Sequence, residues 1–361
     1  MGVVILATVL MFCTKTFAQR TEGLIPDIDT KIDGEYIGGL RAGHPVYSNQ
    51  VKSYEYIVES KSELLEALEK AKYGDVIFVS NDAKIDLTGH QDITIRAGLT
   101  LASGRGEDGH LGGLITTEDP DAYPLFKCGS NVTIKGLRFA GIDLNEYYNN
   151  DETLKDKAAR FAYKYKIPVS MCIKTNYPGL SVENCEFYGW THAAIGIVGT
   201  KATEANILYN FIHHNRRAGL GYGVAFDGGS ADIKGNLFDY NRHDIAGTGI
   251  EGTSYKAYYN VFLENGTGHS VDMHGGADRQ DNTDIAGTKI EVHNNRFRLP
   301  ETRRAVVIRG VPTKEAVIKN NIVDYIYEGK ASKREGKKYA NPFDQLYSKG
   351  KMVVQSNEVN K

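Results

Sequence analysis

The sequence predicts a single-domain, all-β fold in which short parallel strands coil into a β-helix with an N-terminal capping helix. Two observations lead to this prediction. Segments rich in β-forming residues end repeatedly in Asn, one further residue and an apolar residue, and no amphipathic helix fits between them. Composition narrows the function classes: 43 Lys and Arg against 45 Asp and Glu leave a formal net charge of −2, which excludes a polycation that coats nucleic acid.

The recurring Asn positions set the repeat length. They are Asn210, Asn236, Asn260, Asn295, Asn321 and Asn357, with Cys185 and Leu137 in the same slot of earlier repeats. From Cys185 to Asn260 the intervals are 25, 26 and 24 residues, and the later intervals of 35, 26 and 36 indicate added loops. A period near 25 favours three short strands per rung, with rungs stacked about 4.8 Å apart. The Asn side chains should then hydrogen-bond to one another in a ladder.

The N-terminus has the features of an export signal. Residues 1–18 combine an apolar run, Val3 to Phe12, with a small residue, Ala18, suited to signal-peptidase cleavage, although no basic residue precedes the run. We therefore expect a secreted or periplasmic protein cleaved near Ala18; a stray apolar N-terminus is the alternative. No later segment is apolar enough to cross a membrane, so we expect no integral membrane segment in the mature chain.

The rest of the chain divides into an extension and the coil. Residues 19–59 are expected to pack on the outside, and residues 60–361 to form the β-helix. Its cap is a helix in 60–73, with Ser62 as N-cap and Gly74 at its end, followed at once by a strand from Asp75 to Val79. Solenoids need such a cap because their end rungs are apolar.

Two insertions and three cysteines complete the outline. Residues 144–168 and 328–350 interrupt the rungs, either as loops bordering a groove or as solvated decoration. Cys128, Cys172 and Cys185 lie in β-rich segments without metal-ligand spacing, which favours buried packing over a disulfide or a zinc site.

Aligning the rungs by their Asn slots predicts two columns of side chains. The first column reads His192, Arg217, His243, His269 and Arg304. The second, five residues further along each rung, reads Ile197, Tyr222, Thr248, His274 and Arg309. Neighbouring stretches add Asp227, Asp244, Asp272 and Tyr255, with His213, His214, Asp239 and Tyr240 one turn upstream. Stacked cations repel one another, so a bound polyanion such as an acidic polysaccharide would compensate the column.

β-Elimination across a uronic-acid linkage makes use of such a set. The carboxylate must be neutralised before a base can remove the adjacent proton, and an acid must protonate the departing oxygen. We expect Arg217 to neutralise the carboxylate, His243 to act as base and Tyr222 as acid, with His213 able to exchange roles. The expected substrate ligands are His192, His214, Arg242, His269, Asp272, His274, Tyr255, Arg304, Arg309 and Trp190.

The residues invite comparison with a family. Leu68 to Thr100, in which Ala-x-x-Gly-Asp links the capping helix to a strand, resembles the start of extracellular right-handed parallel β-helix polysaccharide lyases. Tyr209 to Gly276 is similar to secreted bacterial members that we associate with uronic-acid polymers, glycosaminoglycans among them. The resemblance implies a lyase that cleaves an acidic polysaccharide. The chain lacks the three clustered calcium-binding Asp of the pectate branch, which leaves a calcium requirement open.

Other interpretations stay open. Asp227, Asp244 and Asp272 could serve a β-helix glycoside hydrolase or epimerase, since hydrolysis uses paired carboxyl groups. A non-catalytic carbohydrate-binding β-helix is a third possibility, although clustered His argues against it. An Asp-rich segment with Asp278, Asp281 and Asp284 reads either as a calcium site or, in preference, as a polar turn.

Overall fold

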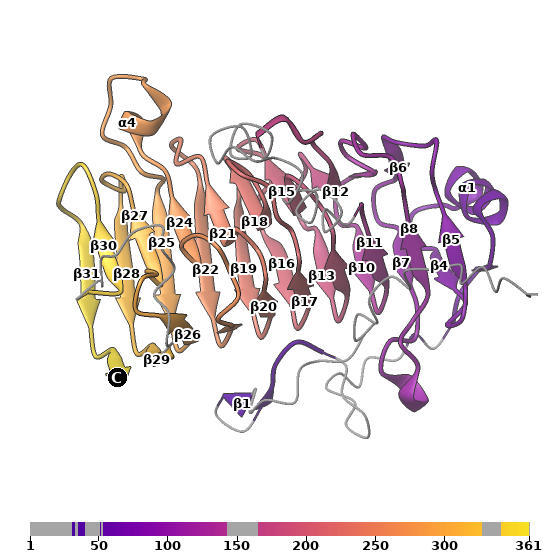
Figure 1. The fold of residues 1–361 in the computed structure, drawn as a ribbon. Coiled ribbons are helices and arrows are strands. Elements are labelled where there is room, and N and C mark those ends of the chain that lie inside the picture. The colour runs from indigo at the N-terminus through magenta and orange to yellow at the C-terminus, as the bar shows by residue number, and fades with distance from the viewer. Residues whose placement is uncertain are drawn as a thin grey trace, which may run out of the picture.

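The structure is a computed structural model that describes residues 31–32, 35–39, 51, 53–142, 165–326 and 341–360. Three long parallel sheets wrap around one hydrophobic core, and successive strands of the chain pass from sheet to sheet, one strand in each per rung (Figure 1). This arrangement confirms the predicted parallel β-helix. The expected signal peptide and most of the two expected insertions lie outside the described residues.

The strand bounds follow the three sheets. The first sheet contains β3 (Tyr56–Val58), β4 (Val76–Val79), β7 (Thr100–Ala102), β10 (Thr133–Lys135), β13 (Ser181–Glu183), β16 (Ala205–Leu208), β19 (Ser230–Lys234), β22 (Ser254–Tyr258), β25 (Lys289–His293), β28 (Glu315–Lys319) and β31 (Met352–Gln355). The second contains β5 (Lys84–Asp86), β8 (Leu114–Thr116), β11 (Arg138–Ala140), β14 (Glu186–Tyr188), β17 (Phe211–His213), β20 (Leu237–Asp239), β23 (Val261–Phe262), β26 (Arg296–Pro300), β29 (Ile322–Ile326) and β32 (Glu358–Asn360). The third contains β6 (Ile93–Ile95), β9 (Phe126–Cys128), β12 (Met171–Thr175), β15 (Ala193–Val198), β18 (Tyr222–Asp227), β21 (His243–Gly247), β24 (Val271–Met273), β27 (Val306–Ile308) and β30 (Phe343–Gln345). Separately, β1 (Lys31–Ile32) and β2 (Glu35–Tyr36) pair antiparallel.

The predicted Asn ladder stands at the corner between the first and second sheets. From Asn210 to Asn357, each Asn donates through Nδ2 to Oδ1 of the next, at 2.9–3.0 Å. The residue before the Asn has a left-handed backbone, as at Tyr209 (φ 56°) and Gly235 (φ 68°), which turns the chain sharply. The Asn amides thereby provide hydrogen-bond partners for backbone groups at the corner, which have none in either sheet.

Stacked aromatic rings fill the coil. Phe139 lies 4.9 Å from Phe187, and Phe238, Phe262 and Phe297 follow one another at 5.1 and 4.5 Å, with nearly parallel planes. Register causes this stacking, because these residues occupy the same inward position of paired strands. One continuous apolar core therefore holds the three sheets rigidly in place.

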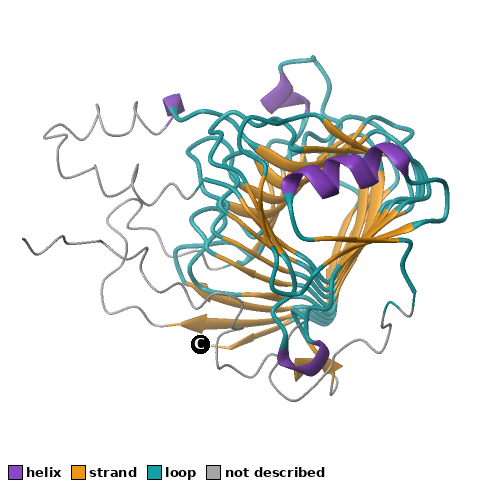
Figure 2. Cartoon of the chain, turned by 90° about the vertical axis from the view of Figure 1, so that its right-hand side faces the viewer, coloured by secondary structure: helices purple, strands orange, loops and turns teal. Residues whose placement is uncertain are grey.

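The N-terminal cap is present with shifted bounds. Helix α1 (Lys61–Lys70) lies across the open end of the coil (Figure 2) and buries Leu64, Ala67 and Leu68. Its N-cap is Ser60 rather than Ser62, because the Ser60 hydroxyl accepts from the backbone of Glu63 while the Glu63 carboxylate bonds back in a capping box. The helix ends at Lys70, before Gly74.

The region predicted as an outer extension contains both outer and inner parts. Ile37 is fully buried on the outside of the second sheet against Phe211, Leu237 and neighbouring apolar residues. Strand β3, by contrast, pairs with β4 as the first strand of the first sheet. The coil therefore begins before residue 60, earlier than predicted.

The three cysteines beyond the N-terminal segment are buried and free, as expected. Burial raises the pKa of the Cys128 and Cys172 thiols far above the ordinary value and that of Cys185 to about 12, so none is primed as a nucleophile. Within the described part of the chain, no helix has the length and apolarity to span a membrane.

Candidate functional site

A cavity of about 330 Å³ lies on the outer face of the third sheet. Its floor follows one register row, in which Lys174, Gly196, Ala225 and Ala246 are successive partners on β12, β15, β18 and β21. The next partner in this row is Asp272 on β24. Three small residues between a lysine and a buried carboxylate leave a shallow groove along the coil axis.

Five rings lie in sequence along one side of this groove. Tyr123, His192, Tyr222, His243 and His269 follow one another with ring centroids 5.2, 5.7, 5.8 and 5.6 Å apart. The first three line the cavity, whereas His243 is only 2% exposed. The last four rings stand at the starts of the adjacent strands β15, β18, β21 and β24, so their spacing reflects the distance between rungs.

The observed register corrects the predicted columns. Tyr222 is the partner of His243, so it occupies the position expected for Arg217. The reason is the turn before β18: Tyr222 follows Asn215 by seven positions, whereas His243 follows Asn241 by two. Gly219 and Gly221, both at positive φ, accommodate the longer turn. The number of residues between the Asn slot and the third-sheet strand is therefore not the same in every rung, and the predicted columns are wrong at this one.

His192 and Tyr222 have opposite protonation tendencies. Burial, together with Arg217 and Lys174, lowers the pKa of His192 to about 4, so its imidazole is neutral at pH 7. Burial raises the pKa of Tyr222 above its ordinary value, against the opposing charge of Arg242, so its hydroxyl stays protonated. That hydroxyl donates to the carbonyl oxygen of Gly219 at 3.1 Å. The pair thus offers a proton acceptor beside a proton donor.

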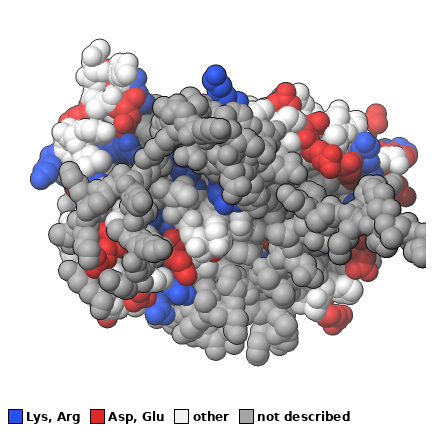
Figure 3. Space-filling view, viewed as in Figure 1, with Lys and Arg blue, Asp and Glu red and all other residues white. Residues whose placement is uncertain are grey.

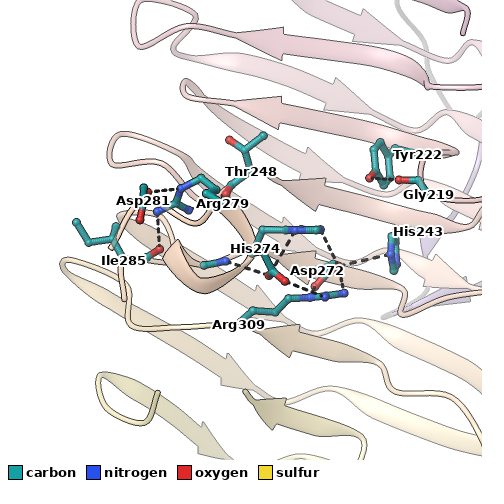
Figure 4. Close-up of polar contacts among 12 residues, drawn as sticks. Gly219, Tyr222, His243, Thr248, Asp272, His274, Arg279, Asp281, Ile285 and Arg309 are labelled. Atoms are coloured by element: carbon teal, nitrogen blue, oxygen red, sulfur yellow. Dashed lines mark hydrogen bonds and ion pairs between the residues drawn. The ribbon is translucent and has the colours of Figure 1, made fainter. Parts of the chain in front are cut away.

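Asp272 organises the far end of the groove (Figure 4). It is fully buried and accepts from Nε and Nη2 of Arg309 at 2.9 and 2.8 Å. Nε2 of His274 lies 3.4 Å and Nε2 of His243 3.5 Å from its Oδ2. Although burial disfavours its charge, these neighbours hold the pKa of Asp272 well below the ordinary range. Asp272 therefore positions cations and does not face the cavity.

The two histidines beside Asp272 differ. His274 lines the cavity, and its Nδ1 lies 3.4 Å from Oδ2 of Asp278, so carboxylates face both ring nitrogens. His243 approaches the backbone oxygen of His269 through Nδ1 at 2.6 Å, and a carbonyl can only accept. Burial lowers the pKa of His243 to about 3. His243 therefore lies beneath the groove, contrary to its expected role as the base that touches the substrate.

Lys174 and Arg217 differ in their availability to a ligand. Nε of Arg217 donates to the Ile167 backbone oxygen at 2.7 Å, and its Nη1 and Nη2 bond further carbonyls. It ties the end of the inserted segment to the coil, which contradicts its expected place as carboxylate neutraliser. Lys174 lines the cavity and forms no hydrogen bond or ion pair with any described residue. Sequence reasoning missed Lys174, because its rung lacks the Asn marker.

His213 and His214 belong to a different face. His213 ends β17 in the second sheet, where its Nε2 lies 3.0 Å from the buried Oε1 of Glu186 and its Nδ1 2.7 Å from Nδ1 of His214. His214 stacks on Tyr240. The expected grouping of these two histidines with His243 and Tyr222 on one wall is therefore wrong.

Several other expected ligands are not accessible or are already paired. Trp190 is fully buried and Tyr255 is 3% exposed, both within the coil, so neither can stack on or bond a sugar. Arg304 is paired with Asp344 at 3.0 Å. Arg242 lies over the Tyr222 ring, 5.9 Å from its centroid. Fewer of the expected ligands than predicted are therefore open to the cavity.

The segment with Asp278, Asp281 and Asp284 does not fit a calcium ion. Asp278 is turned to His274 and Arg309, and Asp281 accepts from Arg279 and Thr283. Among the residues that the structure describes, no group of three or more His, Cys, Asp or Glu converges as metal ligands. Where described residues are visible in Figure 3, acidic and basic side chains are interspersed.

Comparison with known proteins adds one informative likeness. No family model and no curated protein matches this chain. Among solved structures, the alginate lyase from Paenibacillus sp. str. FPU-7 superposes with a TM-score of 0.56 at 14% identity, over 84% of this chain and 94% of the lyase. That likeness shows the fold. The Yersinia enterocolitica Family 28 exopolygalacturonase also matches, at a TM-score of 0.33 and 14% identity over 83% of this chain and 62% of that one.

Proposed function

We propose that this protein is a polysaccharide lyase that cleaves a uronic-acid-containing polymer by β-elimination in the groove of the third sheet. The observation that carries the proposal is the pairing of a neutral imidazole, His192, with a protonated phenol, Tyr222, in a cavity that is also lined by Lys174, a cation without an ion pair to any described residue. β-Elimination needs a base, an acid and a charge that stabilises the carboxylate. The fold shared with the Paenibacillus alginate lyase is consistent with this chemistry.

The roles follow from the protonation states. Lys174 neutralises the uronate carboxylate, which acidifies the neighbouring C5 proton. His192 removes that proton, and the electron pair forms the C4–C5 double bond as the C4–oxygen bond breaks. Tyr222 gives its proton to the departing oxygen, and solvent exchange then restores both residues. These roles replace the assignment of Arg217 as neutraliser and His243 as base, while Tyr222 keeps its expected role.

The acidic residues in the groove give less support to hydrolysis. Of the three carboxylates considered for a hydrolase, Asp244 and Asp272 are at most 1% exposed and lie 3.4 and 2.8 Å from the guanidinium nitrogens of Arg303 and Arg309. Only Asp227 is exposed. A hydrolase needs two carboxyl groups that flank the bond, one of them able to donate a proton. Burial does raise the pKa of Asp244 to about 6, but that side chain cannot reach a sugar.

The proposal is tested by measuring the ultraviolet absorbance of the unsaturated product with alginate, polygalacturonate, hyaluronan, chondroitin and ulvan-type polymers. We expect wild-type protein to generate this absorbance, and His192→Ala, Tyr222→Phe and Lys174→Ala each to reduce the initial rate by about a hundredfold or more. The matched controls His293→Ala, Tyr259→Phe and Lys319→Ala lie in or beside the first sheet and should retain the wild-type rate. New reducing ends without absorbance would contradict the proposal.

A further inference from the structure

The groove of the third sheet is open at one end and covered at the other. Its floor belongs to one register row of outward-facing residues that runs along the whole sheet. On β6 and β9 this row contains Thr94 and Lys127, and both are exposed. On β24 and β27 it contains Asp272 and Val307, and both are 0% exposed although the row faces outward. A polymer in the groove can therefore continue past β9 but not past β24.

The covered end is a wall that is braced to the coil. Helix α4 (Gly276–Arg279) follows β24, and its Asp278 lines the cavity. Oδ1 of Asp278 lies 3.6 Å from Nη1 of Arg309, which belongs to the rung after the helix. Nη1 of Arg279 donates to the Thr248 backbone oxygen at 2.8 Å, in the rung before it (Figure 4). Contacts to both neighbouring rungs hold this α4 wall in place.

The order of the proposed catalytic groups determines which end of a polymer meets the α4 wall. Lys174, His192 and Tyr222 belong to three successive rungs, those of β12, β15 and β18. Lys174 and His192 act on the carboxylate and the proton of C5, whereas Tyr222 acts on the C4 oxygen. That oxygen links the uronate to the next sugar on its non-reducing side. The direction from β12 to β18, and on to the wall at β24, is therefore the direction of the non-reducing end.

The wall leaves room for a short piece of chain beyond the cleaved bond. From Tyr222 on β18 to the covered Asp272 on β24 there are two strand spacings, or about 10 Å at about 4.8 Å per spacing. One sugar of an extended chain is about as long as one spacing, so about two sugars fit. The cavity of about 330 Å³ is at the lower end of the range of about 300–1,000 Å³ for sites that bury a small ligand. This size suits a chain end better than a long run of polymer.

From this geometry we infer that the protein is exolytic: it binds the non-reducing end of the polymer against the α4 wall and releases about two sugars per cleavage. This inference rests on the proposed function and describes how the same site acts on a chain. The C4–oxygen bond breaks, Tyr222 protonates the oxygen of the released piece, and His192 takes the C5 proton of the remaining chain. The remaining chain then carries an unsaturated uronate at its new end, which enters the groove in the next cycle.

Oligosaccharides much longer than the groove, with a fluorescent amine attached at the reducing end, test the inference. They are prepared from alginate, polygalacturonate, hyaluronan and chondroitin, and the products are separated by size at early times. We expect the labelled fragment to shorten in steps of about two sugars, with only short unlabelled products. Labelled fragments of all sizes at early times, or shortening from the labelled end, overturn the inference and leave the proposed lyase standing. No unsaturated product from any polymer overturns both.

A substitution beside the wall isolates the cause. Ala246 is the partner of Asp272 on the preceding strand, so Ala246→Phe should fill the place next to the wall. The released piece should shorten to about one sugar, and kcat/KM should fall by at least about tenfold. Thr94→Phe is the matched control, because it adds the same ring to the same row on the open side, and it should keep the wild-type product size and rate.

Far-ultraviolet circular dichroism establishes that both variants are folded. Released pieces of unchanged size from folded Ala246→Phe would overturn the inference. The product pattern of the wild-type protein decides independently of this variant.

Discussion

Removal of one ladder amide, Asn236→Ala, should destabilise the coil by about 3 kcal/mol. The Oδ1 of Asn236 accepts from the backbone N–H and the Nδ2 of Asn210, and its Nδ2 donates to Ile207, Lys234 and Asn260. After truncation, the buried Asn210 N–H loses its partner, which costs about 1–3 kcal/mol. The other bonds are partly compensated, because the Asn210 amide still reaches Val182, and together they contribute about 1–2 kcal/mol more.

The measurement is the free energy of unfolding from urea titrations followed by circular dichroism. Asn357→Ala is the matched control: its amide ends the ladder in the last described rung and accepts from the Asn321 backbone N–H at 2.9 Å. Because Asn357 is only half-buried, water can replace these bonds once it is truncated, and the loss should stay below about 1 kcal/mol. Equal losses in the two variants, or a loss below about 1 kcal/mol for Asn236→Ala, would refute the argument that the ladder satisfies buried backbone groups. An unchanged m-value is needed for a two-state comparison.

Three further predictions concern the groove. With a His192 pKa of about 4, kcat/KM should stay flat from neutral pH to about pH 5 and fall as pH drops through about 4; a fall centred near 6.5 would contradict a buried, neutral base. Arg309→Met should cost about 2–4 kcal/mol at pH 7, because it leaves Asp272 buried without its guanidinium partner. The pKa of Asp272 is lower in the folded chain than in the unfolded chain, so the stability lost in Arg309→Met should be full above the unfolded pKa of about 3.9 and shrink as pH falls below it. A loss that does not depend on pH in urea titrations would contradict the ion pair. Ala225→Phe should fill the floor and reduce kcat/KM by about a hundredfold without loss of thermal stability, whereas Val317→Phe on the outer face of the first sheet should not change kcat/KM.

Buried neutral histidines add a pH dependence of stability that needs no substitution. Burial lowers the pKa values of His192 and His269 to about 4 and that of His243 to about 3. The unfolded chain takes up protons on these groups below about pH 6.5, while the folded chain does not, so stability falls as pH drops from about 6.5 to 4. Thermal melts at a series of pH values test it, and a melting temperature that is constant over this range would contradict the burial.

The periodic parts of the fold could be predicted from the sequence, and the irregular parts could not. The Asn ladder could be predicted because each corner needs the same amide at the same place. Asn therefore recurs in the sequence once per rung. The capping helix is likewise visible from its apolar face, although a capping box at Ser60 competes with Ser62 for the N-cap. Strand β3 was missed because its partner lies beyond the intervening helix.

The predicted columns of side chains agree with the structure only in part. Tyr222 and the histidine column lie on one sheet, yet a turn longer by five residues placed Tyr222 where Arg217 was expected. Whether a side chain points into or out of the coil was harder to predict. Trp190 and Tyr255 point into it, and only the packing of neighbouring rungs determines their direction. Lys174 carries no local signal, because a single lysine in a short strand is usually a solvated surface residue.

The most direct test of the central claim is the origin of the oxygen at the cleaved bond. The reaction is run briefly in heavy-oxygen water with the polymer that gives the highest rate. The new reducing ends are reduced at once with borohydride, because their anomeric oxygen exchanges with water, and the product ends are analysed by mass spectrometry. β-Elimination predicts an unsaturated uronate at the new non-reducing end and no solvent oxygen in either product. Incorporation of one solvent oxygen per cleavage, with saturated ends, would contradict the lyase and favour a hydrolase.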